Sequence, residues 1–504
     1  MPSRDTFLGI DVGTTGVKAT LIDRNGKVIV QRRVEYSTLH FKPLWVEQNP
    51  WDWWKATCAA IKEVTEVSQE GARNIRGIGV SSQAPSLLGI DSGGQPLGNA
   101  LIWMDRRSEQ ECNELKTLVG QETIQQISGN RIDPYYMLPK LLWQKKHQRN
   151  QYNRTTAYIQ ANGWIIYQLT KKASIDVSHA ALTQLYHIHQ QNWDDALIYE
   201  LGLASEKLPD IYRCMEVVGQ VTAEAASLLG LSEGIPVVAG AIDGATAPLG
   251  LKLIKPNQAF EMSGQSSGIG VILDQPITHP NLALLKHAVD GQWILKGSMS
   301  ASGGALQWYR DQLDGRSGQV DAFTDYENMV KTIPAGSKGL IFLPYLAGER
   351  APLWDSDVRG MFFGLQLSTD KAQMIRSIME GTAYGLRTIQ DELKDAGWSM
   401  ESLLGTGGGY FSKEWSQIKA DILETEIKVL SSDVETASLG AAYLGLLSVT
   451  GGTVADLPEA TIITSYVPNP VHQKIYRNGY SIFKGLYQRN KELFRLISSI
   501  DQGI

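Results

Sequence analysis

The sequence contains few cysteines and no long apolar run. Its three cysteines among 504 residues, Cys58, Cys112 and Cys214, are widely spaced and odd in number. That spacing is typical of neither a disulfide framework nor a zinc site. No window approaches the roughly 18 consecutive apolar residues that a membrane-spanning helix requires, and no signal peptide is evident at the start. We therefore expect a cytoplasmic protein that makes no membrane contact.

Basic residues are not in excess either. The chain has 47 Lys and Arg against 53 Asp and Glu, a formal net charge of −6. General binding to nucleic acid or to an anionic membrane requires a basic face, so neither partner is expected. A local basic pocket is still compatible with this composition. The length predicts roughly two to four domains.

Two familiar nucleotide-binding motifs are absent. The chain has no Gly-x-x-x-x-Gly-Lys-Ser/Thr segment, which excludes a P-loop enzyme. It also has no Gly-x-Gly-x-x-Gly after a predicted strand, which argues against a dinucleotide-dependent dehydrogenase. A nucleotide would therefore have to bind through other glycine-rich turns.

Hydrophobic periodicity indicates an α/β protein whose two halves begin alike. The first half shows β-β-β-α-β order, with predicted strands over 7–12, 17–22 and 28–34, a helix over 49–67 and a strand over 75–80. The second half has predicted strands over 258–262, 269–273 and 293–295, followed by a helix over 305–313. This similarity of pattern suggests a duplicated unit.

Two such units predict two lobes with a cleft between them. We place the N-terminal lobe at residues 1–245 and the C-terminal lobe at 246–504. The segment of about 105–230 is predicted to be a mostly helical insertion in the first lobe. A helix is expected from about residue 470 to the end.

Two acids follow short apolar runs at predicted strand ends. Asp243 follows the run 236–242, and Asp11 lies near the end of the predicted strand over 7–12. Small-molecule sites in open α/β folds form at such strand ends. Two carboxylates beside glycine- and hydroxyl-rich turns favour phosphate and metal chemistry, in which one acid is free to act as a base.

The turn after the first strand has the features of an anion site. Gly13 lets the backbone approach a ligand, and the hydroxyls and N–H groups of Thr14 and Thr15 can hold a phosphate. Lys18 could add a positive charge. Asp11 would bind Mg²⁺ through water, because Mg²⁺ keeps much of its hydration. The alternative is a plain β-hairpin with a turn aspartate.

Further glycine-rich turns are candidates for nucleotide contacts in the second half. The predicted residues are Gly264, Gln265, Ser266, Gly303, Gly407, Gly408, Gly409 and Ser412. Three successive glycines before a predicted helix over 413–423 suit close approach of a nucleotide, and Ser412 is a suitable N-cap. The alternative for the triple glycine is a flexible loop.

Two stretches are candidate substrate contacts. Gln83 and Ala84 lie just past a predicted strand, and Trp103, Asp105 and Arg106 follow later. A carboxylate, a guanidinium and an indole suit recognition of a polyol. The alternative is an Asp–Arg ion pair at a helix start beside a core tryptophan.

Taken together, these motifs resemble the FGGY family of carbohydrate kinases over essentially the whole chain. The resemblance rests on residues 9–18, 103–107, 137–143, 240–243, 344–352, 359–360, 380–381 and 407–409, in the order of the family. It implies two actin/hexokinase-like (ribonuclease H-like) lobes with a central cleft and helical insertions. The N-terminal lobe, 1–245, would be the sugar-binding side and the C-terminal lobe, 246–504, the nucleotide-binding side. It also implies ATP and Mg²⁺ as cofactors, and it is compatible with a homodimer.

The resemblance implies phosphorylation of a primary hydroxyl of a small sugar or polyol. Asp243 would accept the hydroxyl proton, and Asp11 would order hydrated Mg²⁺. The chain is most similar to members that use a ketopentose such as D-xylulose, but it has Ala84 and Pro85 where these usually have Met-His, and Gln265 where the family usually has Thr. Ribulose, fuculose, gluconate, glycerol and tetritols stay open as substrates. A non-catalytic sugar or nucleotide sensor is the alternative on this scaffold; a chaperone-like ATPase would need a peptide-binding domain, which is not apparent.

Overall fold

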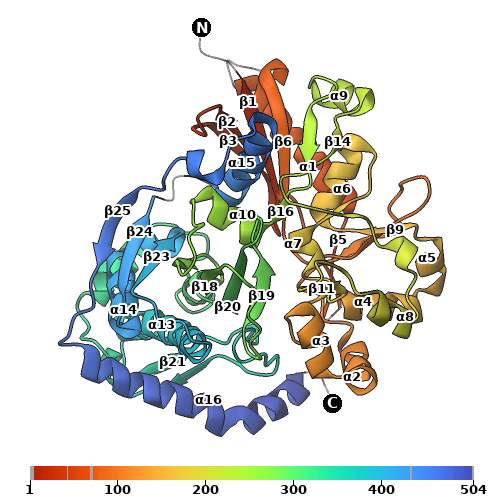
Figure 1. Cartoon of the computed structure of the whole chain (residues 1–504). Helices are drawn as coiled ribbons and strands as arrows, with labels where there is room; N and C mark the ends of the chain where they lie inside the picture. Colours follow the sequence, from red (N-terminus) through yellow and green to blue (C-terminus); the bar gives the residue numbers. More distant parts are fainter. Residues whose placement is uncertain (1–4, 43, 68–71, 432–433, 502–504) are drawn as a thin grey trace.

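Two seven-stranded sheets, each at the centre of one lobe, organise the fold (Figure 1). The computed structural model describes residues 5–42, 44–67, 72–431 and 434–501. Residues 1–4, where no signal peptide was evident, and the last three residues of the predicted terminal helix lie outside these ranges. The mixed α/β, two-lobed architecture agrees with the fold class expected from the sequence.

The first sheet has the strand order β14-β15-β6-β1-β2-β3, with β16 also paired to β6. Its strands are β1 (Thr6–Val12), β2 (Gly16–Asp23), β3 (Val28–Glu35), β6 (Ile75–Ser82), β14 (Val217–Gln220), β15 (Pro236–Val238) and β16 (Ala241–Ile242). β1, β2 and β3 are antiparallel, whereas β6 is parallel to β1. The three predicted strands and the fourth parallel one are therefore present.

The second sheet repeats this order and adds one strand at its edge. Its strands are β17 (Ala259–Met262), β18 (Ser267–Leu273), β19 (Ala283–Lys286), β20 (Trp293–Met299), β23 (Ser402–Thr406), β24 (Glu426–Leu430) and β25 (Ile462–Tyr466). β17, β18 and β20 pair antiparallel, and β23 is parallel to β17. The edge strand β19 was not predicted from the sequence.

One helix from late in the sequence covers the first sheet. α15 (Thr436–Thr450) packs on β1, β2 and β6 and on α10 (Asp243–Gly250) (Figure 1). The approach is close, because a Cβ added at Gly9 would lie 1.9 Å from the carbonyl oxygen of Ser438. A Cβ at Gly440 would lie 1.9 Å from the carbonyl oxygen of Thr246. Glycine is thus required where α15 meets β1 and α10.

The insertion of the first lobe contains helices joined by short strands. Its helices are α2 (Glu109–Leu118), α3 (Gln121–Ser128), α4 (Met137–His147), α5 (Arg149–Arg154), α6 (Ala161–Thr170), α7 (Val177–Ala180), α8 (Asp195–Glu200) and α9 (Ala223–Leu229). Its short strands are β9 (Ala157–Ile159), β10 (Ile175–Asp176), β11 (Tyr186–His187), β12 (Asn192–Trp193) and β13 (Ile211–Tyr212). The predicted mostly helical segment therefore also carries strand pairs.

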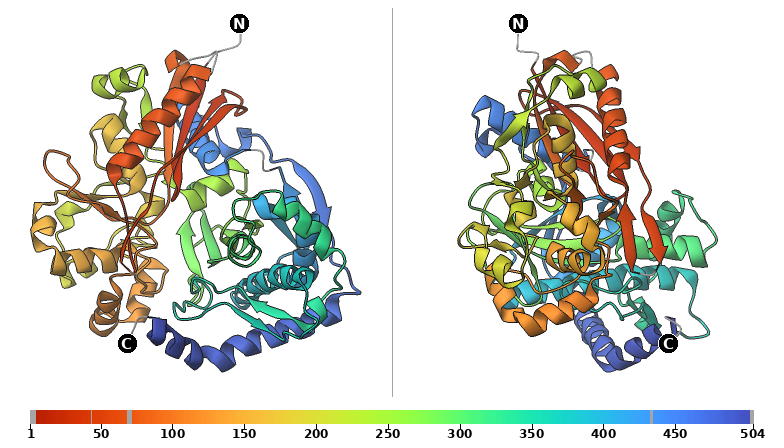
Figure 2. Two further views of the ribbon diagram at one scale, coloured as in Figure 1. Left: turned by 180° about the vertical axis from the view of Figure 1, so that it is seen from behind. Right: turned by 90° about the vertical axis from the view of Figure 1, so that its right-hand side faces the viewer.

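The remaining elements frame the two sheets. They are β4 (Leu39–Lys42), β5 (Trp45–Gln48), α1 (Pro50–Val67), β7 (Leu88–Ile90), β8 (Ala100–Leu101), α11 (Gly303–Trp308), α12 (Ala322–Val330), β21 (Ile341–Leu343), β22 (Met361–Phe363), α13 (Lys371–Asp395), α14 (Lys413–Leu423) and α16 (Gln473–Asp501). The helix predicted over 305–313 starts earlier, at Gly303, and its last turn, Tyr309–Leu313, is a π-helix. α16 runs along the outside of the second lobe (Figure 2). None of the described helices is both long enough and apolar enough to cross a membrane.

Candidate active site

Asp11 and Asp243 face one cavity of about 460 Å³ between the two lobes. Asp11 lies near the end of β1, and Asp243 begins α10 immediately after β16. Because β16 and β1 both pair in parallel with β6, their carboxyl ends lie at the same edge of the first sheet. The cavity is therefore where an open α/β sheet is expected to bind a small molecule.

Asp11 is a buried carboxylate with an unsatisfied oxygen. It is 2% exposed, and its Oδ1 has no hydrogen-bond partner among the described residues. Its Oδ2 lies 3.8 Å from Nζ of Lys18, which in turn lies 3.0 Å from Glu435. Burial raises the pKa of Asp11 to about 6; Lys18 opposes this shift and the negative charge of Asp243 adds to it. Burial alone would lower the pKa of Lys18, but Asp11 and Glu435 raise it above its ordinary value.

The turn after β1 is held by side chains from across the first lobe. Gly13 donates its N–H to the carbonyl of Gly16 at 3.0 Å, which closes the turn. Thr14 Oγ1 accepts a hydrogen bond from Trp103 Nε1 and donates one to Gln83 Oε1, each at 3.1 Å. Thr14 and Thr15 both line the cavity with Gly13. The turn therefore forms part of the cavity wall, and the phosphate contact expected of it stays a prediction.

Asp243 faces the cavity, and its carboxylate is close to the backbone of Gly244 and to the charge of Lys296. Its Oδ1 accepts the N–H of Gly244 at 2.6 Å. Burial raises the pKa of Asp243 above its ordinary value, and the positive charge of Lys296 opposes this shift. A carboxylate with a raised pKa is a better proton acceptor than an exposed one.

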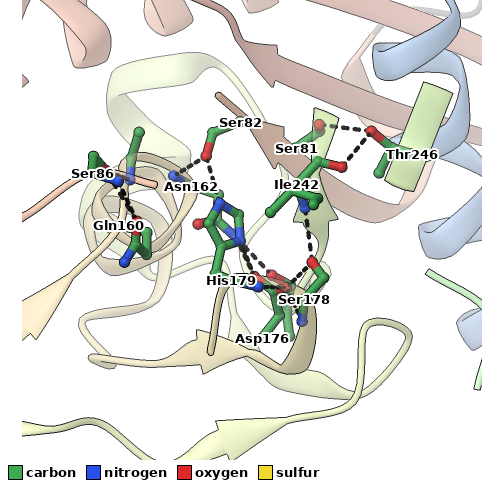
Figure 3. A network of polar contacts seen from close by, with 12 residues as sticks. Ser81, Ser82, Ser86, Gln160, Asn162, Asp176, Ser178, His179, Ile242 and Thr246 are labelled. Atoms are coloured by element: carbon green, nitrogen blue, oxygen red, sulfur yellow. Dashed lines mark hydrogen bonds and ion pairs between the residues drawn. The ribbon is translucent and has the colours of Figure 1, made fainter. Parts of the chain in front are cut away.

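A buried network supports β16, the strand that directly precedes Asp243 (Figure 3). Asp176 caps α7 by accepting the N–H groups of Ser178 and His179. Its carboxylate also accepts the Ser178 hydroxyl at 2.5 Å, and Ser178 Oγ accepts the N–H of Ile242 at 2.9 Å. The residue directly before Asp243 is therefore fixed by a hydrogen bond from the insertion.

The same network contains the residue types of a hydrolytic triad. His179 lies 2.5 Å from Asp176 through Nδ1 and 3.0 Å from Ser82 Oγ through Nε2 (Figure 3). All three are at most 1% exposed, and Ser82 Oγ also accepts the N–H of Asn162. Burial opposes the charge of Asp176, but His179 lowers its pKa below the ordinary value. A serine so enclosed cannot reach a substrate, so the network is structural.

A second pocket of about 460 Å³ adjoins the first from the side of the second lobe. Gly264, Ser266, Gly407 and Gly408 line it. The two pockets share four lining residues, Met262, Ser266, Glu435 and Thr436. This arrangement joins the glycine-rich turns of the second lobe to the two acids.

Four other predicted nucleotide contacts shape this pocket without lining it. The Gln265 side chain bonds to Gln307, and Gly303 donates its N–H to the carbonyl of Gly264 at 3.0 Å. A Cβ at Gly409 would lie 2.1 Å from Ser263 Oγ, so this glycine lets the turn pack. Ser412 caps α14 by accepting the N–H of Trp415, as predicted.

Some of the predicted substrate residues line the cavity and others do not. Ala84 and Trp103 line the cavity, whereas Gln83 lies behind Thr14. Asp105 is fully buried, accepts the N–H of Val46 and pairs with Arg107 at 2.6 Å.

Arg106 forms a two-pronged ion pair with Asp133, at 2.6 and 3.1 Å. The Asp–Arg ion pairing that the sequence left open as an alternative is thus what the structure shows at Asp105 and Arg106. Neither side chain is on the cavity wall.

Several cavity residues were missed by reasoning from the sequence. They include Tyr135, Lys296, Arg350 and Trp354. Tyr135 donates its hydroxyl to the carbonyl of Ala84 at 2.8 Å, and the Arg350 guanidinium lies 5.2 Å from the centre of the Trp103 ring. No local motif marks Tyr135, Lys296 or Trp354. Arg350 lies in the segment 344–352 that carries the family resemblance, but no role was predicted for it, because these side chains reach the cavity only through the tertiary fold.

Comparison with known proteins assigns the chain to a family. Residues 6–250 match the N-terminal domain, and residues 262–449 the C-terminal domain, of the FGGY family of carbohydrate kinases. The chain belongs to the FGGY family. This FGGY protein is therefore a carbohydrate kinase, that is, a phosphotransferase, as the sequence motifs implied.

Its FGGY relatives include enzymes named for different substrates. The chain is 30% identical over 500 residues to a xylulose kinase of Staphylococcus epidermidis, covering 97% of this chain and 98% of the relative. It is also 30% identical over 508 residues to a gluconokinase of Bacillus subtilis, covering 99% and 98%. The crystal structure of a ligand-bound xylulose kinase from Lactobacillus acidophilus superposes with a TM-score of 0.90 at 27% identity, covering 98% and 100%. The relatives establish a sugar kinase without fixing its sugar.

Proposed function

We propose that this kinase transfers the γ-phosphoryl group of ATP to a primary hydroxyl of a small sugar or polyol. The carrying observation is that Asp11 and Asp243 face one cavity, which adjoins a glycine-lined pocket of the second lobe. D-Xylulose is the ketopentose candidate and gluconate the acidic one, because relatives of both names match at 30% identity.

Asp243 is the proposed general base. Its carboxylate faces the cavity, and its raised pKa favours removal of the hydroxyl proton as the acceptor oxygen attacks the γ-phosphorus. The glycine-rich pocket would receive the adenosine, and the turn at Gly13, Thr14 and Thr15, with Ser266 opposite, would hold the phosphates. Trp103 supplies an apolar wall for the acceptor.

Asp11 fits a role as magnesium ligand. Its buried Oδ1 lacks a hydrogen-bond partner among the described residues, and an oxygen ligand is what Mg²⁺ requires. Magnesium, when bound, would neutralise charge that develops on the phosphate oxygens. Lys18 keeps Asp11 and Glu435 in place by pairing with both. Because the reaction consumes ATP, we place it in the cytoplasm; pairing of two copies stays a prediction.

Acceptor-dependent release of ADP tests this function. Purified protein with MgATP should release ADP only when a sugar, polyol or aldonate is added, and a coupled assay over a panel of such acceptors measures this. A sensor on the same scaffold would bind ligands without sustained ADP release. ADP release that is independent of any acceptor would contradict the proposal and indicate a simple ATPase.

A further inference from the structure

A lysine on β20 projects into the cavity without a partner. Lys296 and Ser298 lie two residues apart on β20 and both line the cavity, as strand alternation requires. The cross-strand neighbours of Lys296 are Gly270 on β18 and Ala283 on β19, neither of which can pair with an ammonium group. Among the described residues, Lys296 Nζ forms no hydrogen bond or ion pair within 4.0 Å. Burial lowers the pKa of Lys296, and Asp243 only opposes that effect.

Arg350 presents a second unpaired cation to the same cavity. Its guanidinium lies over the ring of Trp103, and its Nε is buried without a hydrogen-bond partner in the described part of the chain. The neighbouring acid Glu349 does not engage it through the side chain. Glu349 Oε1 instead accepts the backbone N–H groups of Ser300 and Arg350, at 2.7 and 2.8 Å.

Burial raises the pKa of Glu349 to about 7, so its carboxyl group is only partly charged near neutral pH. Among the described residues, no ion pair within 4.0 Å joins the Arg350 guanidinium to a carboxylate, and its Nε has no hydrogen-bond partner.

The charges on the cavity wall fall into two groups. Lys18 pairs with Asp11 and Glu435, so two carboxylates surround one cation there. Lys296 lies near both Asp243 and Arg350, so two cations accompany one carboxylate there. Magnesium and Lys18 suit the first group. The second group has one carboxylate for two cations, and a cation that is partly withdrawn from water is unfavourable without a counter-charge.

We infer that the acceptor is a sugar acid whose carboxylate binds Lys296 and Arg350 while one of its hydroxyls reaches Asp243. This inference rests on the proposed kinase function and selects an aldonate-type substrate over a neutral ketopentose. An arginine fork matches the two oxygens of a carboxylate, and a lysine adds a compact point charge. The Arg350 guanidinium also lies over the Trp103 ring, 5.2 Å from its centre, which is within the range of a cation–π contact.

The rival role for these cations is to hold the transferred phosphoryl group. In that case, removing Lys296 would lower kcat for every acceptor by a similar factor. A carboxylate-binding role predicts instead a loss that is confined to acidic acceptors and appears mainly in KM. The two roles therefore separate when acidic and neutral acceptors of the same skeleton are compared.

The experiment uses matched acceptors and matched variants. kcat and KM are measured by coupled ADP release for D-gluconate against D-glucitol, and for D-xylonate against xylitol and D-xylulose; each aldonate and its polyol differ at one terminal carbon. The variants are Lys296→Met and, as control, Lys286→Met, which removes a lysine that packs on Trp293 of the same sheet but does not line the cavity. Sugar monophosphates are included, since a second phosphate could also meet the two cations.

The wild-type protein should prefer the aldonates, and Lys296→Met should lower the aldonate-to-polyol ratio of kcat/KM about 10- to 100-fold, the worth of a hydrogen bond to a charged group. Lys286→Met should keep the wild-type ratio. The inference would be overturned if the wild-type protein preferred neutral acceptors or sugar monophosphates. It would also be overturned if Lys296→Met lowered kcat equally for all acceptors. In each case the proposed kinase function would still stand. Absence of ADP release with every acceptor would count against the proposed function. Aldonate binding would then be measured by calorimetry. Binding that Lys296→Met abolishes would still support the carboxylate site, and a wild-type protein that binds no aldonate would refute it.

Discussion

Asp11 and Asp243, from opposite ends of the first half of the chain, face the same cavity, and the charge of Asp243 helps to raise the pKa of Asp11. Each carboxylate thus makes ionisation of the other less favourable. Lys18 opposes this effect at both acids, and Lys296 opposes it at Asp243. The two acids thus have different surroundings, which suits them to separate tasks, one as a metal ligand and the other as a base.

Replacement of the proposed base should remove turnover more than binding. Asp243→Asn is expected to lower kcat by about 10²- to 10⁴-fold, the usual contribution of a general base. The KM of the acceptor should change far less. Steady-state ADP release measures both, and Asp290→Asn, an exposed acid paired with Arg213 outside the cavity lining, is the control. Near-normal turnover in Asp243→Asn would show that another group accepts the proton.

The raised pKa of Asp11 predicts a stabilising substitution. The folded-state pKa of about 6 exceeds the ordinary value of 3.8, so the folded protein binds more protons between these values. The free energy of unfolding therefore falls as pH rises from about 4 to about 6 and stays lower above that window. Asp11→Asn should raise this free energy at pH 7.5 by up to about 3 kcal/mol, while activity with MgATP is lost.

Urea denaturation at pH 7.5 and at pH 5 checks this expectation. The difference between Asp11→Asn and the wild-type protein should shrink at the lower pH, because wild-type Asp11 is then largely protonated. A variant that is less stable at both values would indicate that the ion pair with Lys18 outweighs the burial of the charge.

The hydrogen bond from Ile242 to Ser178 should matter for turnover. Ser178→Ala leaves the buried N–H of Ile242 without its acceptor, which costs about 1–3 kcal/mol and loosens the residue before Asp243. We expect kcat to fall while the KM for ATP stays similar. The matched control is Ser128→Ala, a buried serine that bonds to the carbonyl of Ile124 in α3. Equal kinetic effects of the two variants at equal stability would contradict a positioning role for Ser178.

Two glycine-to-alanine substitutions should change the free energy of unfolding in opposite directions. At Gly440, an added Cβ would lie 1.9 Å from the backbone oxygen of Thr246, so Gly440→Ala must push α15 from α10. A loss of at least about 1–3 kcal/mol, typical of overpacking, is expected. At Gly485 in α16, a Cβ meets nothing within 4 Å, and Gly485→Ala should stabilise by about 0.5–1 kcal/mol. Thermal denaturation of both variants compares them directly.

Local patterns predicted the elements whose limits are set by local interactions. The helix over 413–423 has the predicted bounds because Ser412 caps it by accepting the N–H of Trp415. The strands over 7–12 and 17–22 were predicted to within one residue at each end, since the glycine turn between them is visible in the sequence. β19, by contrast, is only four residues long, Ala283–Lys286, and forms a strand by pairing with β20.

The site was predictable in part for the same reason. Asp11, Asp243 and the turn at Gly13 stand at recognisable strand ends, and all line the cavity. Lys296 and Arg350 are single charged residues in ordinary surroundings, and only the folded chain shows that each lacks a counter-charge. At Asp105 the sequence could not choose between a ligand contact and an ion pair, because only the fold shows that Arg107 pairs with Asp105 while Arg106 pairs with Asp133.

The packing of α15 has a consequence for dissecting the chain. The first sheet is built from the first half of the sequence, but one of its faces is covered by a helix that is synthesised almost two hundred residues later. A fragment ending at residue 250 would expose Gly9 and the apolar surface around it to water. Such a fragment should be prone to aggregation when expressed alone, and it should become soluble when the complementary C-terminal fragment is supplied in trans.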